Sequence, residues 1–102
     1  MPAYLITYDL SYADGQDYAK LIDMLNKSGA VRATESSWYF FSPTWTATQI
    51  GQHMKKFMHA RDVLTVNEMT IGNNHVSYGL SPEAIAWRAK HLIPAKPAVK
   101  RK

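Results

Sequence analysis

A single carboxylate, Asp9, ends the apolar run Leu5–Tyr8 near the start of this 102-residue chain. An aspartate between a strand and a turn commonly accepts hydrogen bonds from the backbone N–H groups that follow it, and thereby caps the turn. Ser11, further along the same loop, could contact a phosphate or position a water, or could be an ordinary turn residue. The residue types leave open whether this segment is a polar site or only a turn.

The histidines of the chain do not have the spacing of a metal site. His53 and His59 are six residues apart, whereas a helical zinc pair has i, i+4 spacing. The chain contains no cysteine, so thiolate ligands and disulfides are excluded and a reducing compartment is expected. No glycine-rich phosphate loop and no G-x-S-x-G nucleophile motif is present.

Basic residues gather in the last third of the chain. Residues 1–72 hold six Lys/Arg and seven Asp/Glu, a net charge of −1, whereas residues 73–102 hold six Lys/Arg against Glu83 alone, a net charge of +5. A basic arm can bind nucleic acid, although a charged tail can also simply remain solvated. The candidate phosphate contacts of this third are Arg88, Lys90, Lys96, Lys100, Arg101 and Lys102. The candidate phosphate contacts in residues 1–72 are Arg32, Lys55, Lys56 and Arg61.

The segments that must position these side chains alternate between strand and helix patterns. Strands are predicted from runs of β-branched and aromatic residues, and helices from apolar residues three and four positions apart. The expected strands are Tyr4–Asp9, Val31–Glu35, Ser37–Ser42 and Val63–Ile71. The expected apolar helix faces are Tyr18, Leu21, Ile22 and Leu25 for the first helix, and Ile50, Met54, Phe57 and Met58 for the second. Thr46 and Gln49 form a capping box that predicts the start of the second helix.

This order of elements predicts an α+β fold. The pattern β-α-β-β-α-β is complete by residue 71 and resembles the ferredoxin-like plait, an antiparallel sheet with both helices on one face. His75–Tyr78 is predicted as a short extra strand. Ser81-Pro82-Glu83 predicts the start of a C-terminal helix with Ile85, Ala89 and Leu92 on one face. The expected organisation is a ferredoxin-like domain over 1–78, a helical extension over 79–94 and a flexible basic tail over 95–102.

Both faces of the sheet are expected to be largely apolar. Tyr4, Ile6 and Tyr8 share one face of the first strand, and Leu5 and Thr7 share the other. The face without helices must then pack on something, and a second copy of the chain is the simplest candidate, since closed two-fold dimers are the commonest oligomers. We therefore expect a homodimer, with the extra strand and the C-terminal helix contributing to its interface.

No segment of the sequence is predicted to enter a membrane. No basic region precedes the N-terminal apolar stretch, which Asp9 interrupts, so no signal peptide is expected. No apolar run approaches the roughly 20 residues of a membrane span. Together with the lack of cysteine, this predicts a cytoplasmic protein without a membrane partner.

The elements also resemble those of a known family. A strand ending in Tyr8-Asp9 is followed by a helix closing on Gly29, a strand pair around ESSWYF at 35–40, a second helix and a strand with Leu64-Thr65-Val66. Over residues 4–71, this arrangement resembles the small CRISPR-associated endonuclease family, the subunit that partners the integrase in spacer acquisition. The chain is most similar to the Cas-like SinR family proteins, and more distantly to virulence-associated protein D. The basic extension after residue 78 departs from the family pattern.

The resemblance implies a role for Asp9. In dimers of the family, the first-strand aspartates of the two chains approach each other and can hold one divalent metal, here Mg²⁺, which prefers oxygen ligands and keeps several waters. Such a metal could polarise a phosphodiester or activate a water, so the implied function is a Mg²⁺-dependent endonuclease that acts on RNA or DNA. Ser36 and Ser37 stand where the family often has polar residues near the aspartate, and this makes Ser37 a candidate nucleic-acid contact. The alternative function is a non-catalytic dimeric scaffold or antitoxin-like regulator that binds a protein partner.

Overall fold

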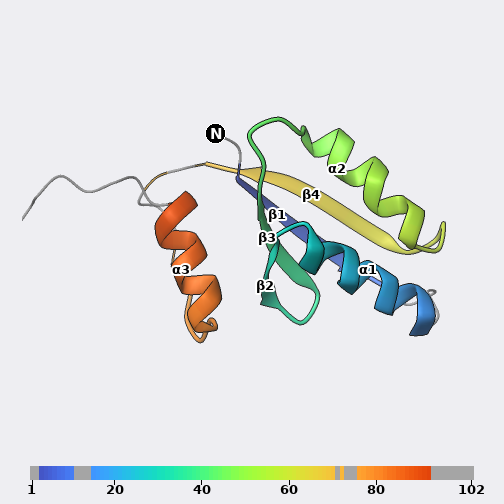
Figure 1. Ribbon diagram of the computed structural model, residues 1–102, viewed down its shortest axis with the longest axis horizontal. Helices are drawn as coiled ribbons and strands as arrows, with labels where there is room; N and C mark the ends of the chain where they lie inside the picture. Colours follow the sequence, from blue (N-terminus) through green and yellow to red (C-terminus); the bar gives the residue numbers. More distant parts are fainter. Residues whose placement is uncertain (1–2, 11–14, 71, 73–75, 93–102) are drawn as a thin grey trace, which may run out of the picture.

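The computed structural model describes residues 3–10, 15–70, 72 and 76–92 (Figure 1). In chain order, these residues form β1 (Ala3–Asp9), α1 (Gly15–Lys27), β2 (Val31–Thr34), β3 (Ser37–Phe41), α2 (Ala47–Met54), the short 3-10 helix η1 (Lys55–Phe57), β4 (Val63–Met69) and α3 (Pro82–His91). Each strand predicted up to residue 71 and each predicted helix has a counterpart among these elements. The α+β class is therefore confirmed.

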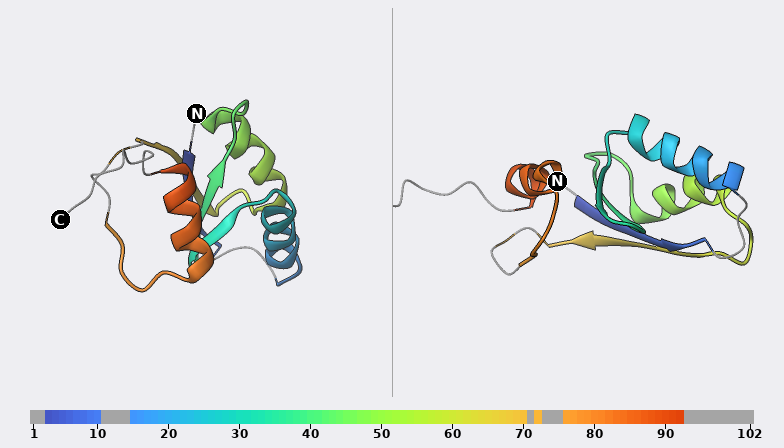
Figure 2. Two further views of the ribbon diagram at one scale, coloured as in Figure 1. Left: turned by 60° about the vertical axis from the view of Figure 1, so that its left-hand side comes forward. Right: turned by 90° about the horizontal axis from the view of Figure 1, so that it is seen from below.

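The four strands form one antiparallel sheet in the order β2-β3-β1-β4. β1 lies inside the sheet, where Leu5 pairs with Tyr39 of β3 on one side and with Asn67 of β4 on the other. The register of the β2–β3 pair shifts between Arg32 and Thr34, so this ribbon is bulged. An antiparallel sheet with α1 and α2 on one face is compatible with a ferredoxin-like plait (Figure 2).

The larger core lies between the sheet and the pair α1 and α2. Because side chains alternate across a strand, Tyr4, Ile6 and Tyr8 all point toward these helices. They pack there with Leu21 of α1 and Ile50 of α2. The first strand is thus fixed in register, since a slip by one residue would turn its apolar side chains away from both helices.

Two helices begin at caps that the sequence predicts. At α2, the Thr46 hydroxyl accepts a hydrogen bond from the Gln49 backbone N–H at 3.2 Å, and the Gln49 side chain accepts one from the Thr46 N–H at 2.9 Å. At α3, the Ser81 hydroxyl accepts from the Ala84 N–H at 3.2 Å, and Pro82 occupies the first helical position. Each cap satisfies N–H groups that the first turn of a helix leaves without a partner.

The opposite face of the sheet is covered at one end by α3 of the same chain. Ala3 and Tyr39 pack there with Ala84, Trp87 and Leu92. The Trp87 and Tyr39 rings are stacked, with centroids 4.9 Å apart and 11° between their planes. The apolar residues at this end of the face are thus covered by α3 of the same chain, whereas the sequence predicts a second copy on this face.

The buried side of α3 differs from the predicted one. Ile85 is 57% exposed and Ala89 is also exposed, so of the predicted face only Leu92 is buried. Trp87 instead points at the sheet, where it is 6% exposed. Its ring buries more apolar area than Ile85 could, and the flat ring of Tyr39 gives it a stacking surface, so these contacts determine the rotation of α3.

The predicted extra strand is not found in the described part of its range. Val76–Tyr78 forms no strand, and His75 lies outside the described residues. The Tyr78 side chain is 90% exposed, so it does not pack on the sheet. The chain crosses here from β4 toward α3, and Gly79 adopts a φ of +79°, which suits a turn and not a strand. Among the described residues, no helix is both long enough and apolar enough to cross a bilayer.

Candidate functional site

Asp9 is the last residue of β1 and is exposed to solvent. It pairs with Val63, the first residue of β4. Because its neighbour Tyr8 points toward α1 and α2, the alternation of side chains places Asp9 on the opposite face of the sheet. α3 covers the other end of that face, near Ala3 (Figure 2). The predicted position of Asp9 at a strand end is therefore confirmed, and this end of the face is left uncovered by α3.

Four hydroxyl side chains cross the sheet near Asp9, one on each strand. Thr7 of β1 pairs with Ser37 of β3 and with Thr65 of β4, and Ser37 pairs in turn with Thr34 of β2. The Thr34 and Ser37 hydroxyl oxygens are 2.6 Å apart and share a hydrogen bond. Neighbouring strands lie about 4.8 Å apart, so the hydroxyls follow one another at short intervals. We call these four residues the hydroxyl row.

The tip of the β2–β3 hairpin lies beside the Asp9 end of β1. The Tyr8 backbone N–H donates a hydrogen bond to the Ser36 carbonyl at 3.0 Å. Ser36 is exposed, whereas Ser37 is buried and bonded within the hydroxyl row. The structure thus places Ser37 close to the strand end that carries Asp9. Ser11 lies outside the described residues.

A basic turn precedes β4 at the same end of the sheet. The His59 N–H donates to the Asp62 carboxylate at 2.9 Å, and the Arg61 N–H donates to Nδ1 of His59 at 3.0 Å. Arg61 is exposed and stands two residues before Val63, the pairing partner of Asp9. The turn therefore adds a guanidinium to the end of the sheet that carries Asp9.

Arg32, another predicted phosphate contact, lies on the face covered by α1. Its guanidinium is 5.2 Å from the centre of the Trp38 ring and donates to the Tyr18 hydroxyl at 2.8 Å and to the Glu35 carbonyl at 2.9 Å. The Trp38 indole N–H donates to the Tyr8 hydroxyl at 2.9 Å. Burial raises the pKa of Tyr8, and the hydrogen bond from Trp38 and the charge of Arg32 act in the opposite direction. Arg32 is thus separated from Asp9 by the sheet.

Two of the predicted basic contacts of the C-terminal third, Arg88 and Lys90, belong to α3 at the other end of the sheet from Asp9. Arg88 of α3 is only 8% exposed, and its guanidinium donates to the Tyr39 hydroxyl at 3.2 Å. Arg88 therefore makes a contact inside the protein, whereas a side chain that binds phosphate must be exposed. Lys90 is exposed on the same helix, which lies at the other end of the sheet (Figure 1). The remaining predicted contacts, Lys96, Lys100, Arg101 and Lys102, lie outside the described residues.

The donor set at Asp9 limits how a metal could be held. Within the part of the chain that the structure describes, no three His, Cys, Asp or Glu side chains come together as a metal site. A Mg²⁺ ion at Asp9 would need further oxygen ligands, which a second chain, a phosphate and water can supply. Asp9 therefore fits a shared or substrate-assisted site, and the described residues do not complete a metal site around it within one chain.

Compared with protein-family models, with curated proteins and with solved structures, the chain gives no match. The class of the protein follows from its own features. It is an α+β protein with a four-stranded antiparallel sheet. The end of the sheet that α3 leaves uncovered carries the Asp9 carboxylate, the hydroxyl row and the Arg61 guanidinium.

Proposed function

We propose that the chain is a ferredoxin-like plait that forms a homodimer and binds nucleic acid at the Asp9 end of its sheet. The observation that carries this proposal is the position of Asp9, exposed at a strand end beside the hydroxyl row. Ser and Thr hydroxyls contact phosphate oxygens without reading the base sequence. Arg61 adds positive charge at the same end, and such charge supplies most of the affinity of non-specific binding.

The proposed reaction is Mg²⁺-dependent cleavage of RNA or DNA. One carboxylate per chain is too few for a Mg²⁺ site, but a two-fold axis near Asp9 would bring two carboxylates to one ion. When bound, the ion would polarise the phosphodiester or lower the pKa of an attacking water. The role of the protein is then to hold the phosphate over the hydroxyl row, beside the two Asp9 carboxylates.

A cleavage assay tests the catalytic part of this proposal. Wild type, Asp9→Ala and Asp23→Ala would be incubated with labelled RNA and duplex DNA in Mg²⁺, Mn²⁺ or EDTA. Asp23 is the matched control, because it is an exposed carboxylate on α1 whose contact with Lys27, at 3.1 Å, lies away from the sheet. We expect Asp23→Ala to cleave like wild type and Asp9→Ala to cleave no faster than the EDTA sample. Absence of cleavage by wild type, or equal cleavage by Asp9→Ala, would reject the nuclease.

A binding assay in EDTA tests the hydroxyl row separately. The pair Thr7→Val and Thr65→Val keeps the shape of both side chains and removes their hydroxyls. We expect the double variant to bind single-stranded RNA more weakly than wild type, with unchanged thermal stability, since these residues are exposed or half-buried. Unchanged affinity would show that nucleic acid binds elsewhere or not at all.

A second candidate function is a non-catalytic scaffold or regulator that binds a protein. Tyr78 is 90% exposed and Ile85 is 57% exposed, and both lie on the C-terminal part of the chain. Large apolar side chains in contact with water are typical of protein interaction sites. Nucleic-acid binding without cleavage, combined with loss of a dimer or partner contact in Tyr78→Ser, would favour this function over the nuclease.

A further inference from the structure

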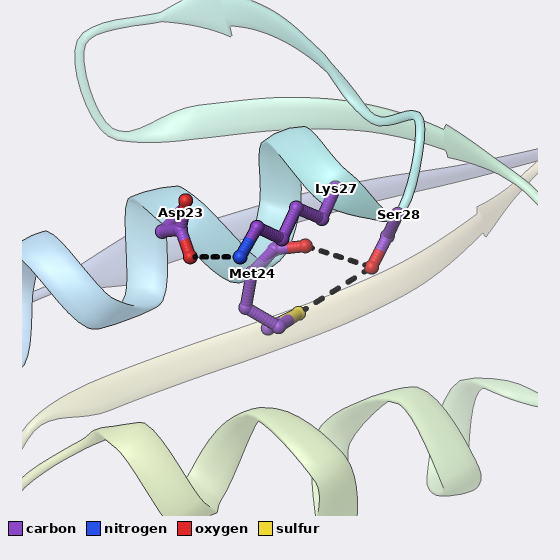
Figure 3. Close-up of polar contacts among 4 residues, drawn as sticks. All are labelled: Asp23, Met24, Lys27 and Ser28. Atoms are coloured by element: carbon purple, nitrogen blue, oxygen red, sulfur yellow. Dashed lines mark hydrogen bonds and ion pairs between the residues drawn. The ribbon is translucent and has the colours of Figure 1, made fainter.

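A cavity of about 330 Å³ opens between α1 and α2, on the face of the sheet that these helices cover. Ile6 and Phe40 contribute to it from the sheet, Met24 from α1 and Met54 from α2. Figure 3 shows the Met24 side chain extending from α1, with the Ser28 hydroxyl bonded to the Met24 carbonyl at 2.8 Å. The cavity thus has a floor of strand residues and two helical walls.

The cavity exists because the two helices do not pack closely along their whole length. α1 contacts η1 at one end of α2, and has fewer contacts with α2 itself. The residues around the opening include the short side chains of Ser28, Ser42 and Thr44, which do not fill the space. Protein interiors are normally close-packed, and a cavity of this volume is within the range of small-molecule sites.

Ser42 gives the cavity a hydrogen-bond donor. It lies just after β3, is 5% exposed and lines the cavity. Its oxygen accepts hydrogen bonds from the backbone N–H groups of Thr44 at 3.3 Å and Trp45 at 2.9 Å. Both bonds use the oxygen as acceptor, and no described residue accepts the hydroxyl hydrogen. A buried hydroxyl whose hydrogen has no acceptor favours a ligand that supplies an acceptor atom.

The other lining side chains favour a flat aromatic ligand. Met24 and Met54 face the cavity from opposite walls, and methionine sulfur makes favourable contacts with aromatic rings. Trp45, which is 41% exposed, meets the His53 ring edge to face at 5.5 Å, and both rings line the cavity. An aromatic ring entering the cavity would therefore meet sulfur atoms and ring edges in geometries that such groups prefer.

The charges around the cavity favour an acid over an amine. None of the described residues that line it is acidic. Lys56 lines an adjoining hollow together with Trp45 and His53, so a positive charge stands next to the cavity. We propose that the cavity binds a small aromatic carboxylic acid, with its ring between Met24 and Met54 and a carboxylate oxygen accepting the Ser42 hydrogen bond.

Solution NMR with 2-naphthoate as the probe tests the position of the ligand. In the full chain labelled with ¹³C at the methionine methyl groups, we expect contacts from the naphthoate ring protons to the Met24 and Met54 methyl groups. Met69 is an internal control, because it packs against α3 on the opposite face of the sheet. Contacts to Met69 of equal strength, or no contacts at millimolar naphthoate, would overturn the proposal. This measurement on wild type does not depend on any variant folding.

Two variants of neighbouring exposed residues test the site by its affinity. Ser28→Phe places a ring at the edge of the cavity, whereas Lys27→Phe adds the same ring at the adjacent residue, whose side chain contacts Asp23 and does not line the cavity. We expect Ser28→Phe to weaken naphthoate binding at least ten-fold and Lys27→Phe to change it less than two-fold. Equal affinities for the two variants would overturn the assignment of the site.

A neutral analogue tests the acid part of the proposal. 2-Methylnaphthalene keeps the ring and lacks the acceptor and the charge. A charge-assisted hydrogen bond contributes about 1.5–3 kcal/mol, so we expect naphthoate to bind at least about ten-fold more tightly than methylnaphthalene. Equal binding of the two probes would show that the cavity recognises only an apolar ring, and would reject the carboxylic acid as its ligand class.

Discussion

Replacing Trp87 by alanine should strongly destabilise the protein, because this side chain fixes α3 to the sheet. Trp87 is 6% exposed, so nearly all of its area is removed from water. A buried aromatic side chain covers roughly 150–250 Å², which at about 25 cal/mol/Å² corresponds to about 4–6 kcal/mol as an upper estimate. The stack on Tyr39 adds about 0.5–1.5 kcal/mol, and alanine retains some of the burial. We expect a net loss of about 3–5 kcal/mol in the free energy of unfolding.

Ile85→Ala is the matched control for this measurement. It truncates a large apolar side chain on the same helix, but Ile85 is 57% exposed. Its loss of burial should therefore cost about 1 kcal/mol or less, and the better helix propensity of alanine offsets part of that cost. Urea unfolding followed by circular dichroism would measure both variants. If Ile85→Ala lowered the free energy of unfolding as much as Trp87→Ala, α3 would not bury its Trp87 side. The buried side would then be the one with Ile85 that the sequence predicts.

Two further predictions concern a helix cap and a half-buried histidine. Thr46→Ala should lower the free energy of unfolding by about 1 kcal/mol, since it removes the acceptor for the Gln49 N–H. Thr48→Ala on the same helix should change the free energy of unfolding by less than about 0.5 kcal/mol. Equal losses of the two variants in urea unfolding would contradict the role of the cap. Burial lowers the pKa of His91 from its ordinary value of 6.5, and the charge of Lys90 lowers it further, so the unfolded state binds the proton more tightly. The contribution of neutral His91 to the free energy of unfolding should be fully present above pH 6.5 and be lost as the pH drops through its lowered pKa. Melting temperatures measured over that pH range should therefore change less in His91→Gln than in wild type.

The strands and helices follow from signals that lie close together in the sequence. The capping box of Thr46 and Gln49 requires only two residues three positions apart, and the structure forms both of its hydrogen bonds. The alternation of Tyr4, Ile6 and Tyr8 is likewise contained in one strand. Features of this kind could be predicted, because their partners are neighbours along the chain.

The rotation of α3 could not be predicted in the same way. Its sequence has apolar residues on two sides, with Ile85 and Ala89 on one and Ala84 and Trp87 on the other. Periodicity alone does not decide between two such stripes. The decision comes from Tyr39, which lies far away in the chain and offers the stacking surface for Trp87. The same distant contact explains why α3 covers Ala3 and Tyr39 on the sheet.

The candidate site is predictable only where a single residue defines it. Asp9 could be placed at a strand end because the apolar run before it ends there. The hydroxyl row could not be predicted, since Thr7, Ser37 and Thr65 become neighbours only once β1 lies between β3 and β4. The cavity between α1 and α2 depends on the angle between two helices, which no local pattern encodes.

In the proposed dimer, α3 and Asp9 lie at different places and would have different roles. If two chains meet through their Asp9 ends, their α3 helices lie outermost, because α3 covers the other end of each sheet (Figure 2). Lys90 of each α3 then flanks the central site. Attraction of phosphates, which salt weakens, would belong to these flanks and to Arg61. Dependence on Mg²⁺ would belong to Asp9 alone, so a substitution of Lys90 should change the salt dependence and leave the Mg²⁺ dependence unchanged.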